Sequence, residues 1–415
     1  MLEPKYQDFT SERPPVFLQA DLDLLRTLGM AGIPAIVGSS DENDPTFASR
    51  YCRGRCILPS RYQPDALVTA MLDAGDRLCA SFGRRVPLKY GQDDWLELIY
   101  AHRDRLQVKF LLLLNDPDVA VGLFTKDRFE ALARKYDLPV PRSLQWDSLA
   151  EIEGAVLAKP RSRSFFYESL LHAQLFERES KALVFENGHA ASSQALVERF
   201  RDQLTFQEYI RGDDRQLWSF HGFSDEQGTV LGSFLGRKIR TSPLLTGQSA
   251  FIELIHDDEL SMYGMRMAER LPLKGAFKMD FKTDAVTGKH FLLEVNARFS
   301  LWNHLGAANG INLMQVAYDY LVSGKRPTPQ TYRKDTRWIS LPRDFRSYCL
   351  LAARGELSFI GWVSSILSTR TVHKHFAWND PAPFVKTCAN RVARMVRNLL
   401  ERIRVRLRKC LSTAS

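Results

Sequence analysis

Residues 275–300, GAFKMDFKTDAVTGKHFLLEVNARFS, form two runs of alternating apolar and polar residues around a turn. Alternate residues of a strand point to opposite faces, so the pattern predicts a β-hairpin with one apolar and one polar face. With the turn near Thr287 and Gly288, a symmetric register pairs Asp280 with Glu294. Two acidic side chains are therefore expected to face each other. The apolar face is expected to carry Phe277, Met279, Phe281, Phe291, Leu293 and Val295.

The acidic pair needs a positive charge, because like charges directly opposite each other destabilise a strand pair. A few hard oxygen ligands suit magnesium that arrives with a phosphate better than an all-protein calcium site. We therefore expect Asp280, Glu294 and Asn296 to hold magnesium. Lys278 and Arg298 lie on the same face and are expected to contact anionic oxygens. The alternative is an ordinary half-buried hairpin with solvated salt bridges.

Two further motifs precede the hairpin, namely AVLAKPRS, which contains Lys159, and FQEYIRGDD at residues 206–214. Their order and approximate spacing resemble those of the ATP-grasp superfamily over residues 15–330. The final EVNARFS is similar both to amino-acid ligases and to carbamoyl-phosphate synthase large subunits. The resemblance implies an N-terminal α/β domain followed by two lobes that bind a nucleotide between them.

The resemblance also implies roles for individual positions. Those matching nucleotide contacts are Lys126, Lys159, Gln207, Glu208, Tyr209, Ile210 and Asp214, the last at the position that takes the ribose hydroxyl groups. Those matching magnesium ligands are Asp280, Glu294 and Asn296. Lys278 and Arg298 match residues that hold the transferred phosphate and the acyl oxygen. The implied cofactors are ATP and Mg²⁺, with two metal ions and with Mn²⁺ as a substitute.

One segment departs from the family pattern, which usually has a glycine-rich loop after the second lysine. Here KPRSRSFFYESLLH follows, and no glycine occurs between Lys159 and Gly188. Backbone amides approach a phosphate closely where glycine leaves room. Arg161 and Arg163 are expected to replace that contact with side chains, and a solvated loop is the alternative.

A basic segment, GRKIRTSPLLTGQS, precedes the hairpin and contains Arg237, Lys238 and Arg240. In the resembling family this strand borders the nucleotide cleft. We therefore expect the segment to receive the carboxylate substrate or the triphosphate, with Arg240 as a catalytic residue. A charged surface loop is the alternative.

Short apolar runs alternate with an amphipathic segment over residues 15–38, which predicts the start of a parallel α/β layer. This segment contains no GxGxxG, so a dinucleotide site is not expected. The predicted fold class is α/β, in the α+β arrangement of ATP-grasp proteins. The predicted parts are a pre-ATP-grasp domain at 1–120, a first lobe at 121–206, a second lobe with the metal site at 207–330, and a helical extension at 331–415.

The extension ends in a basic amphipathic segment, residues 384–411. From Phe384 onward, nine basic residues and one acidic residue give a net charge of +8, within +9 for the whole chain. Apolar residues recur among them at helical spacing: Val392, Met395, Val396, Leu399, Leu400, Ile403, Leu407 and Leu411. Such a helix can lie on an anionic membrane surface, dock on an acidic protein, or pack on its own core. Nucleic-acid binding is not expected, because few aromatic residues are present to stack bases.

The chain has 415 residues with 45% hydrophobic content, which is enough for two or three domains with substantial cores. No apolar run reaches membrane-spanning length and the N-terminus lacks the pattern of a signal peptide. A cytoplasmic location is therefore expected, peripheral to the inner face of the membrane if the basic segment docks there. The six cysteines follow neither a zinc nor a disulfide pattern and are expected to be reduced.

The function implied by the resemblance is an ATP-dependent ligase that activates a carboxylate as an acyl phosphate and joins it to an amine. The substrates would be small molecules such as amino acids or peptides, and a homodimer is compatible with the sequence. One alternative is a bicarbonate-activating carboxylase or a carbamoyl-phosphate-type enzyme. A second is a nucleotide-binding factor that docks at the membrane without catalysis.

Overall fold

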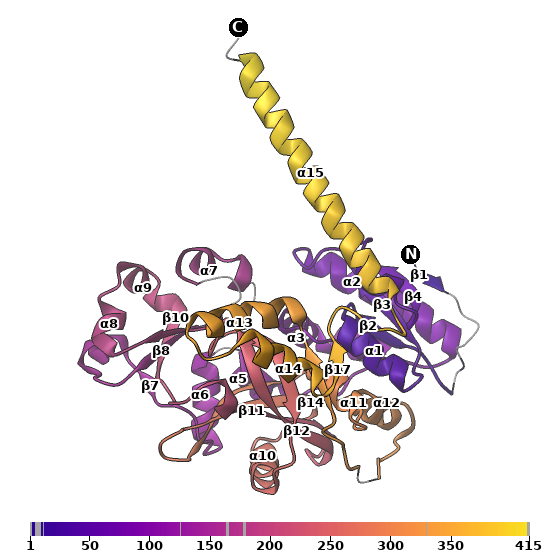
Figure 1. Ribbon diagram of the computed structural model, residues 1–415. Helices are drawn as coiled ribbons and strands as arrows, with labels where there is room; N and C mark the ends of the chain where they lie inside the picture. Colours follow the sequence, from indigo (N-terminus) through magenta and orange to yellow (C-terminus); the bar gives the residue numbers. More distant parts are fainter. Residues whose placement is uncertain are drawn as a thin grey trace.

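The computed structural model describes residues 2–4, 10, 12–124, 126–162, 166–176, 180–328 and 330–412. The side chains of residues 2–4, 124, 126–127, 399 and 402–412 lie outside this description. The described chain forms three sheets (Figure 1).

The N-terminal domain contains a six-stranded sheet of order β1-β4-β3-β2-β5-β6, in which only β1 is antiparallel to its neighbour. Its strands are β1 (Leu2–Pro4), β2 (Val16–Gln19), β3 (Ala35–Ser39), β4 (Cys52–Ile57), β5 (Val86–Lys89) and β6 (Phe110–Leu111). Its helices are α1 (Leu22–Met30), the 3₁₀ helix η2 (Pro45–Ala48), α2 (Pro64–Phe82), α3 (Asp93–Ala101) and α4 (Arg103–Lys109). The predicted parallel α/β layer is confirmed.

Two acidic residues lie where the central strands of this sheet end. Asp21 follows β2 and caps α1, since its carboxylate accepts a hydrogen bond from the Leu24 backbone N–H at 3.1 Å. Asp93 follows β5, which pairs with β2 in parallel. The carboxyl ends of parallel neighbours meet at one edge of a sheet, so both acids face the same crevice.

The first lobe is a four-stranded sheet of order β7-β10-β8-β9 at one side of the molecule (Figure 1). Its strands are β7 (Ser143–Leu144), β8 (Val156–Pro160), β9 (Leu183–Phe185) and β10 (Leu204–Glu208). Its helices are η3 (Trp146–Glu151), η4 (Phe166–Glu168), α7 (Leu170–Leu175), α8 (Gly188–Ser192), α9 (Ala195–Arg199) and η5 (Arg201–Gln203). The lobe has a core of its own around Leu149, Val156 and Phe206.

The second lobe is built on a seven-stranded sheet of order β15-β14-β11-β12-β13-β16-β17. Its strands are β11 (Leu217–Ser224), β12 (Val230–Ser242), β13 (Gln248–Leu254), β14 (Gly275–Thr283), β15 (His290–Asn296), β16 (Thr336–Ile339) and β17 (Arg370–His373). The remaining helices are α5 (Pro117–Phe124), α6 (Lys126–Lys135), η6 (Asp214–Gln216), α10 (Asp258–Arg270), α11 (Trp302–Ala308), α12 (Leu313–Ser323), α13 (Leu341–Ala353), α14 (Phe359–Leu367) and α15 (Ala382–Ser412).

The packing of this sheet modifies the predicted division of the chain. On one face, Phe234 and Trp302 share a core with Leu24 of the N-terminal domain. On the other face, α5 and α6 pack through Val119 and Phe129, although the first lobe was expected to begin at residue 121. Residues 331–415 are not wholly helical, because β16 and β17 extend the sheet.

The central hairpin, β14 with β15, has the predicted register where the acidic residues lie. Asp280 pairs with Glu294, and Lys278 pairs with Asn296. A β-bulge then shifts the pairing, so that Phe281 lies opposite Leu292. The predicted apolar face is therefore wrong in its outer half: Leu292 is fully buried, whereas Phe291 and Leu293 are only half-buried.

Beyond β17 the chain returns to the N-terminal domain and continues into α15, which projects away from the body (Figure 1). Its first turns contact η2, where Lys386 and Asn390 bond to Asn43. Residues 391–398, 400 and 401 are exposed, so packing on the core of the same chain is not observed for this part of the helix.

Candidate active site

Two cavities meet at the acidic hairpin. The large cavity has a volume of about 540 Å³ and lies between the N-terminal domain and the two lobes. The small cavity, of about 100 Å³, lies between the first and second lobes. Glu294 and Lys181 line both, so a group bound in one can reach a group bound in the other at this junction.

The small cavity combines apolar walls with amino groups. Its apolar walls include Pro141, Leu157, Ile210, Leu217, Leu245 and Leu293. Its amino groups belong to Lys159, Lys181, Lys238 and Lys282. Apolar walls suit a flat base, and several ammonium groups suit a chain of phosphates. The small cavity therefore has the chemistry of a nucleotide site.

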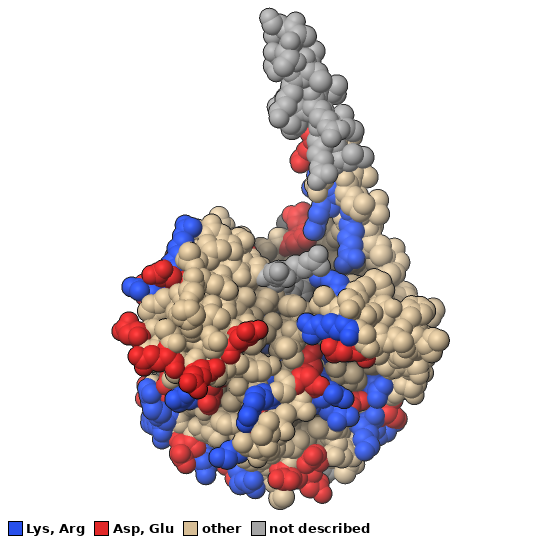
Figure 2. Space-filling model, turned by 60° about the vertical axis from the view of Figure 1, so that its left-hand side comes forward, with Lys and Arg blue, Asp and Glu red and all other residues tan. Residues whose placement is uncertain are grey.

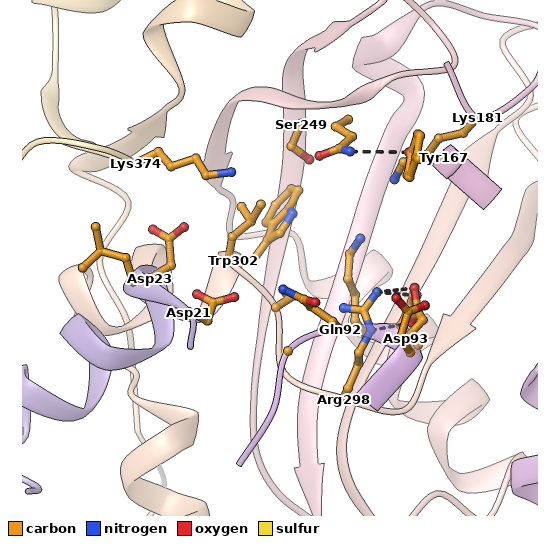
Figure 3. Close-up of a pocket in the computed structure, with 18 of the residues that line it drawn as sticks. Asp21, Asp23, Gln92, Asp93, Tyr167, Lys181, Ser249, Arg298, Trp302 and Lys374 are labelled. Carbon is orange, nitrogen blue, oxygen red and sulfur yellow. Dashed lines mark hydrogen bonds and ion pairs between the residues drawn. The ribbon is translucent and has the colours of Figure 1, made fainter. Parts of the chain in front are cut away.

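The large cavity is lined mainly by polar and charged side chains. Figure 3 shows Asp21, Asp23 and Lys374 on one side, and the ion pair of Arg298 with Asp93 on the other. The cavity contains both signs of charge, which suits small substrates that carry carboxylate and ammonium groups.

Asp280 is held in the ionised state at the junction. Asp280 is 6% exposed, and its carboxylate accepts hydrogen bonds from Lys278 Nζ at 2.6 Å and from Ser219 Oγ. Burial alone would raise its pKa, and so would Glu294, but the positive charges of Lys278 and Lys238 hold the pKa below the ordinary value. Asn296 Nδ2 donates to Glu294 Oε1 at 3.1 Å, so three predicted metal ligands lie together.

The three side chains fit magnesium that arrives with a phosphate. Asp280, Glu294 and Asn296 offer hard oxygen atoms, and two of the three are carboxylates on directly paired residues. Among the described residues, no group of three or more His, Cys, Asp or Glu side chains could hold a metal. Magnesium at this site would therefore draw further ligands from phosphate or water, as it commonly does.

The predicted phosphate and acyl contacts, Lys278 and Arg298, both line the large cavity. Burial lowers the pKa of Lys278, although Asp280 opposes that shift. Arg298 donates to Asp93 and, at 3.4 Å, to Asn296 Oδ1. Burial alone would lower the pKa of Arg298, but Asp93 outweighs this effect and the pKa is raised. The guanidinium therefore keeps its charge beside the predicted magnesium ligands.

Most of the predicted nucleotide residues lie at the small cavity. Lys159 on β8 and Glu208, Tyr209 and Ile210 at the end of β10 line it. Gln207 does not line it, and its buried Oε1 has no hydrogen-bond partner in the described structure.

Asp214, Lys126 and the arginine-containing loop have other outcomes. Asp214 lines neither cavity, and its carboxylate accepts hydrogen bonds from the Thr241 N–H, the Thr241 hydroxyl and the Leu245 N–H. Its contact with ribose stays a prediction. The Lys126 side chain and Arg163 lie outside the described residues. Arg161 donates to the Leu204 carbonyl at 3.3 Å.

Arg240 departs from its predicted catalytic role. Its guanidinium is buried and forms a two-point ion pair with Asp344 on α13, at 2.7 and 2.9 Å. A β-bulge between Lys238 and Arg240 reverses the alternation of side chains, so Lys238 points into the small cavity and Arg240 points away. The structure therefore gives Arg240 a structural contact and places Lys238 at the small cavity.

Two lysines that line the small cavity were not among the predicted site residues. Lys181 lies just before β9, and Lys282 lies two residues beyond Asp280 on β14. Lys282 Nζ donates to the Tyr209 hydroxyl at 3.1 Å, and burial lowers the pKa of Lys282 to about 8. Alternation along β14 placed Lys282 on the polar face with Asp280, and this was the available signal.

Comparison with known proteins identifies the fold. No family model matches the chain. A curated relative, the D-aspartate ligase of Enterococcus faecium (strain Aus0004), is 22% identical over 325 residues, which cover 74% of this chain and 76% of that protein.

Several solved structures superpose on a similar part of the chain. Biotin carboxylase from Campylobacter jejuni superposes with a TM-score of 0.56 at 13% identity, covering 79% of this chain and 75% of that one. N5-carboxyaminoimidazole synthetase from Staphylococcus aureus gives 0.54 at 9% identity, covering 79% and 82%. L-amino acid ligase from Bacillus licheniformis gives 0.51 at 15% identity, covering 75% and 74%. These proteins have the ATP-grasp fold, so this chain has that fold too, as the order of its three motifs predicted.

Proposed function

We propose that this protein is an ATP-dependent ligase that activates the carboxylate of an amino acid and joins it to an amine. One observation supports the proposal above all others: the nucleotide-type cavity and the charged large cavity meet at the carboxylate pair of Asp280 and Glu294. Transfer of a phosphoryl group from ATP to a carboxylate needs such a junction, because donor and acceptor oxygens must lie in line.

The residues of the junction have distinct tasks in this reaction. Lys159, Lys238 and Lys282 hold the phosphates within the small cavity. Asp280, Glu294 and Asn296 hold magnesium, two ions in our proposal, with Mn²⁺ as a substitute. Bound magnesium neutralises charge on the phosphate oxygens.

Lys278 and Arg298 act on the acyl side of the junction. Both line the large cavity, and their positive charges orient the substrate carboxylate toward the phosphate. The carboxylate oxygen bonds to the γ-phosphorus as ADP leaves. The amine then bonds to the acyl carbon and loses a proton, and inorganic phosphate departs.

The nature of the substrates is inferred from charge and from two similar proteins. The large cavity presents both acidic and basic groups, which suits an amino acid better than bicarbonate. A D-aspartate ligase and an L-amino acid ligase are among the similar proteins. We therefore infer an amino acid as the carboxylate substrate.

An isotope experiment tests the reaction type. Amino acids labelled with ¹⁸O in the carboxylate are incubated with ATP, magnesium and a panel of amines, and the released phosphate is analysed by mass spectrometry. Transfer of one ¹⁸O atom to phosphate is expected, because the carboxylate oxygen bonds to phosphorus. ADP formation without this transfer would refute the acyl-phosphate route.

The same assay separates the alternatives. ADP formation that depends on bicarbonate and on no amino acid would favour a carboxylase or a carbamoyl-phosphate-type enzyme. A protein that binds ATP but releases no phosphate with any acid would be a nucleotide-binding factor.

We also propose that α15 docks the enzyme on an anionic membrane surface, with the catalytic body in the cytoplasm. Its exposed apolar side chains, Val392, Met395 and Val396, alternate with arginines in a segment of net charge +8. Figure 2 shows basic side chains on the described part of this projecting helix. None of the described helices is both long and apolar enough to cross a bilayer.

Vesicle sedimentation tests this docking. We expect binding to vesicles of phosphatidylglycerol and phosphatidylcholine, and little binding to phosphatidylcholine alone. The variant Met395→Asp/Val396→Asp should lose binding, whereas the control Arg354→Ala should keep it. Equal sedimentation of both variants would refute the proposal and favour an acidic protein partner. Homodimer formation stays a prediction.

A further inference from the structure

The chain between β17 and α15 forms one wall of the large cavity. Residues 370–380, here called the C-terminal strap, begin as β17 within the sheet of the second lobe and end on the N-terminal domain. Lys374 and His375 of the strap line the large cavity. The strap therefore joins two domains across the candidate active site.

A buried ion pair fixes the far end of the strap. The Asp380 carboxylate is 1% exposed and accepts hydrogen bonds from Arg26 Nε at 3.1 Å, Ser49 Oγ at 2.8 Å and the Arg50 backbone N–H at 2.9 Å. Arg26 also donates to the Lys374 carbonyl at 3.2 Å. The backbone of Lys374 is thereby held in place, which positions its side chain relative to the cavity.

Lys374 faces two aspartates that begin α1. Asp23 is already engaged, because its Oδ1 accepts from His304 Nδ1 at 3.0 Å and from Trp338 Nε1 at 2.9 Å. Asp21 uses Oδ1 for the Leu24 N–H. Burial and the neighbouring charge of Asp23 raise the pKa of Asp21 to about 6. A cationic partner would therefore stabilise the ionised form of this carboxylate at neutral pH.

A hydroxyl group of this cavity has no partner. Ser300 lines the large cavity, is 8% exposed, and its Oγ has no hydrogen-bond partner in the described structure. A buried polar atom without a partner is costly, and a bound polar ligand would remove that cost. This observation, independent of the charges, indicates that the wall bearing Ser300 receives a polar group.

Charge alternates around the cavity. Lys278 and Arg298 contact the predicted magnesium ligands Asp280 and Asn296. Asp21 interacts electrostatically with both Arg298 and Lys374. Figure 3 shows Asp21, Arg298 and Lys374 of the strap around the cavity. A ligand that matches this pattern has a carboxylate, an ammonium group and a second carboxylate.

We propose that Asp21 and Lys374 bind the ammonium and the second carboxylate of an acidic amino acid, with Ser300 as a hydrogen-bond donor, while its reacting carboxylate lies at Lys278 and Arg298. This inference rests on the proposed ligase function and assigns the specificity for that substrate to the C-terminal strap. Asp21 and Lys374 are positioning residues, because neither contacts the atoms that react.

Three related acids test the proposal. Aspartate carries all three groups, succinate lacks the ammonium, and β-alanine lacks the second carboxylate. ADP formation is measured for each acid, using D- and L-aspartate, with wild-type enzyme and with Asp21→Asn, Lys374→Met and Lys374→Arg. Asp21→Asn keeps an N-cap residue, so α1 is preserved. Lys325→Met, an exposed lysine away from the cavity, is the matched control.

Each variant should lose discrimination against one analogue only. Lys374→Met should reduce kcat/KM for aspartate by about 10- to 100-fold and leave β-alanine nearly unchanged, because the lost contact is a charged hydrogen bond. Asp21→Asn should reduce kcat/KM for aspartate by a similar factor and leave kcat/KM for succinate nearly unchanged. Lys374→Arg should restore part of the loss, and the KM for ATP should stay constant throughout.

Two results would overturn the inference. One is an equal loss for aspartate and β-alanine in Lys374→Met, which indicates a structural role for the lysine. The other is a wild-type enzyme that forms ADP with other amino acids but with neither enantiomer of aspartate, which leaves the ligase function intact. If no amino acid supports ADP formation, the proposed function itself is refuted.

Discussion

Replacing Glu294 with glutamine should change the stability of the free protein little but reduce its stabilisation by a nucleotide. In the free protein Glu294 lies directly opposite Asp280, whose pKa it raises by repulsion. Like charges at such positions cost about 0.2–1 kcal/mol. The variant Glu294→Gln removes one of them and preserves the shape of the side chain. Lys278 and Arg298 attract the same carboxylate and offset this repulsion. The free energy of unfolding of the free variant should therefore differ from that of the wild-type protein by less than about 1 kcal/mol.

With a nucleotide bound, the two proteins should differ more. A ligand present at 100 times its dissociation constant adds about 2.7 kcal/mol to the free energy of unfolding. Unfolding entropy scales with length, so for 415 residues this corresponds to a rise in Tm of roughly 3 °C. Glu294→Gln removes a negative ligand of magnesium, so its Tm should rise by less than about 1 °C at the same ligand concentration.

Differential scanning fluorimetry with a nonhydrolysable ATP analogue and magnesium measures both effects. The matched control is Glu356→Gln, an exposed glutamate whose variant should behave as wild type. An equal rise in Tm for Glu294→Gln and wild type would refute the assignment of Glu294 as a magnesium ligand. Loss of the rise in the control as well would indicate an unspecific effect of charge.

Three other substitutions test separate parts of the structure. Burial lowers the pKa of Lys89 to about 7 in the folded state from 10.5, so the unfolded chain binds more protons between these values. In unfolding experiments at pH 7 and 9, the free energy of unfolding of wild type should rise by about 1.4 kcal/mol per pH unit relative to that of Lys89→Met. An equal dependence on pH in both proteins would contradict the lowered pKa. Asp380→Ala leaves the buried Arg26 without its carboxylate partner and should lower the free energy of unfolding by about 3–5 kcal/mol in denaturant unfolding; a loss below 1 kcal/mol would show that the strap is not fixed there. Arg240→Ala should lower stability by a similar amount in the same measurement, yet retain the kcat of the folded fraction; a folded but inactive variant would restore its catalytic role.

The sequence by itself determined the central hairpin and its acidic pair. Alternation with a period of two is a local property, and a turn between two such runs fixes which residues oppose each other. Asp280 and Glu294 therefore pair as predicted, and the order of three short motifs identified the fold. The helix of residues 382–412 also follows from local periodicity.

Tertiary structure decided which side chains reach the cavities. A one-residue bulge next to Arg240 moved it out of the cleft and left Lys238 inside, and a second bulge placed Leu292 in the core. A bulge reverses the side-chain alternation, and no simple residue pattern announces it. The electrostatic interaction of Lys374 with Asp21 and Asp23 joins residues about 350 positions apart, which local patterns do not encode. Strand register depends on residues that are neighbours in the sequence, whereas a cavity is formed by strands and loops that only the folded chain brings together.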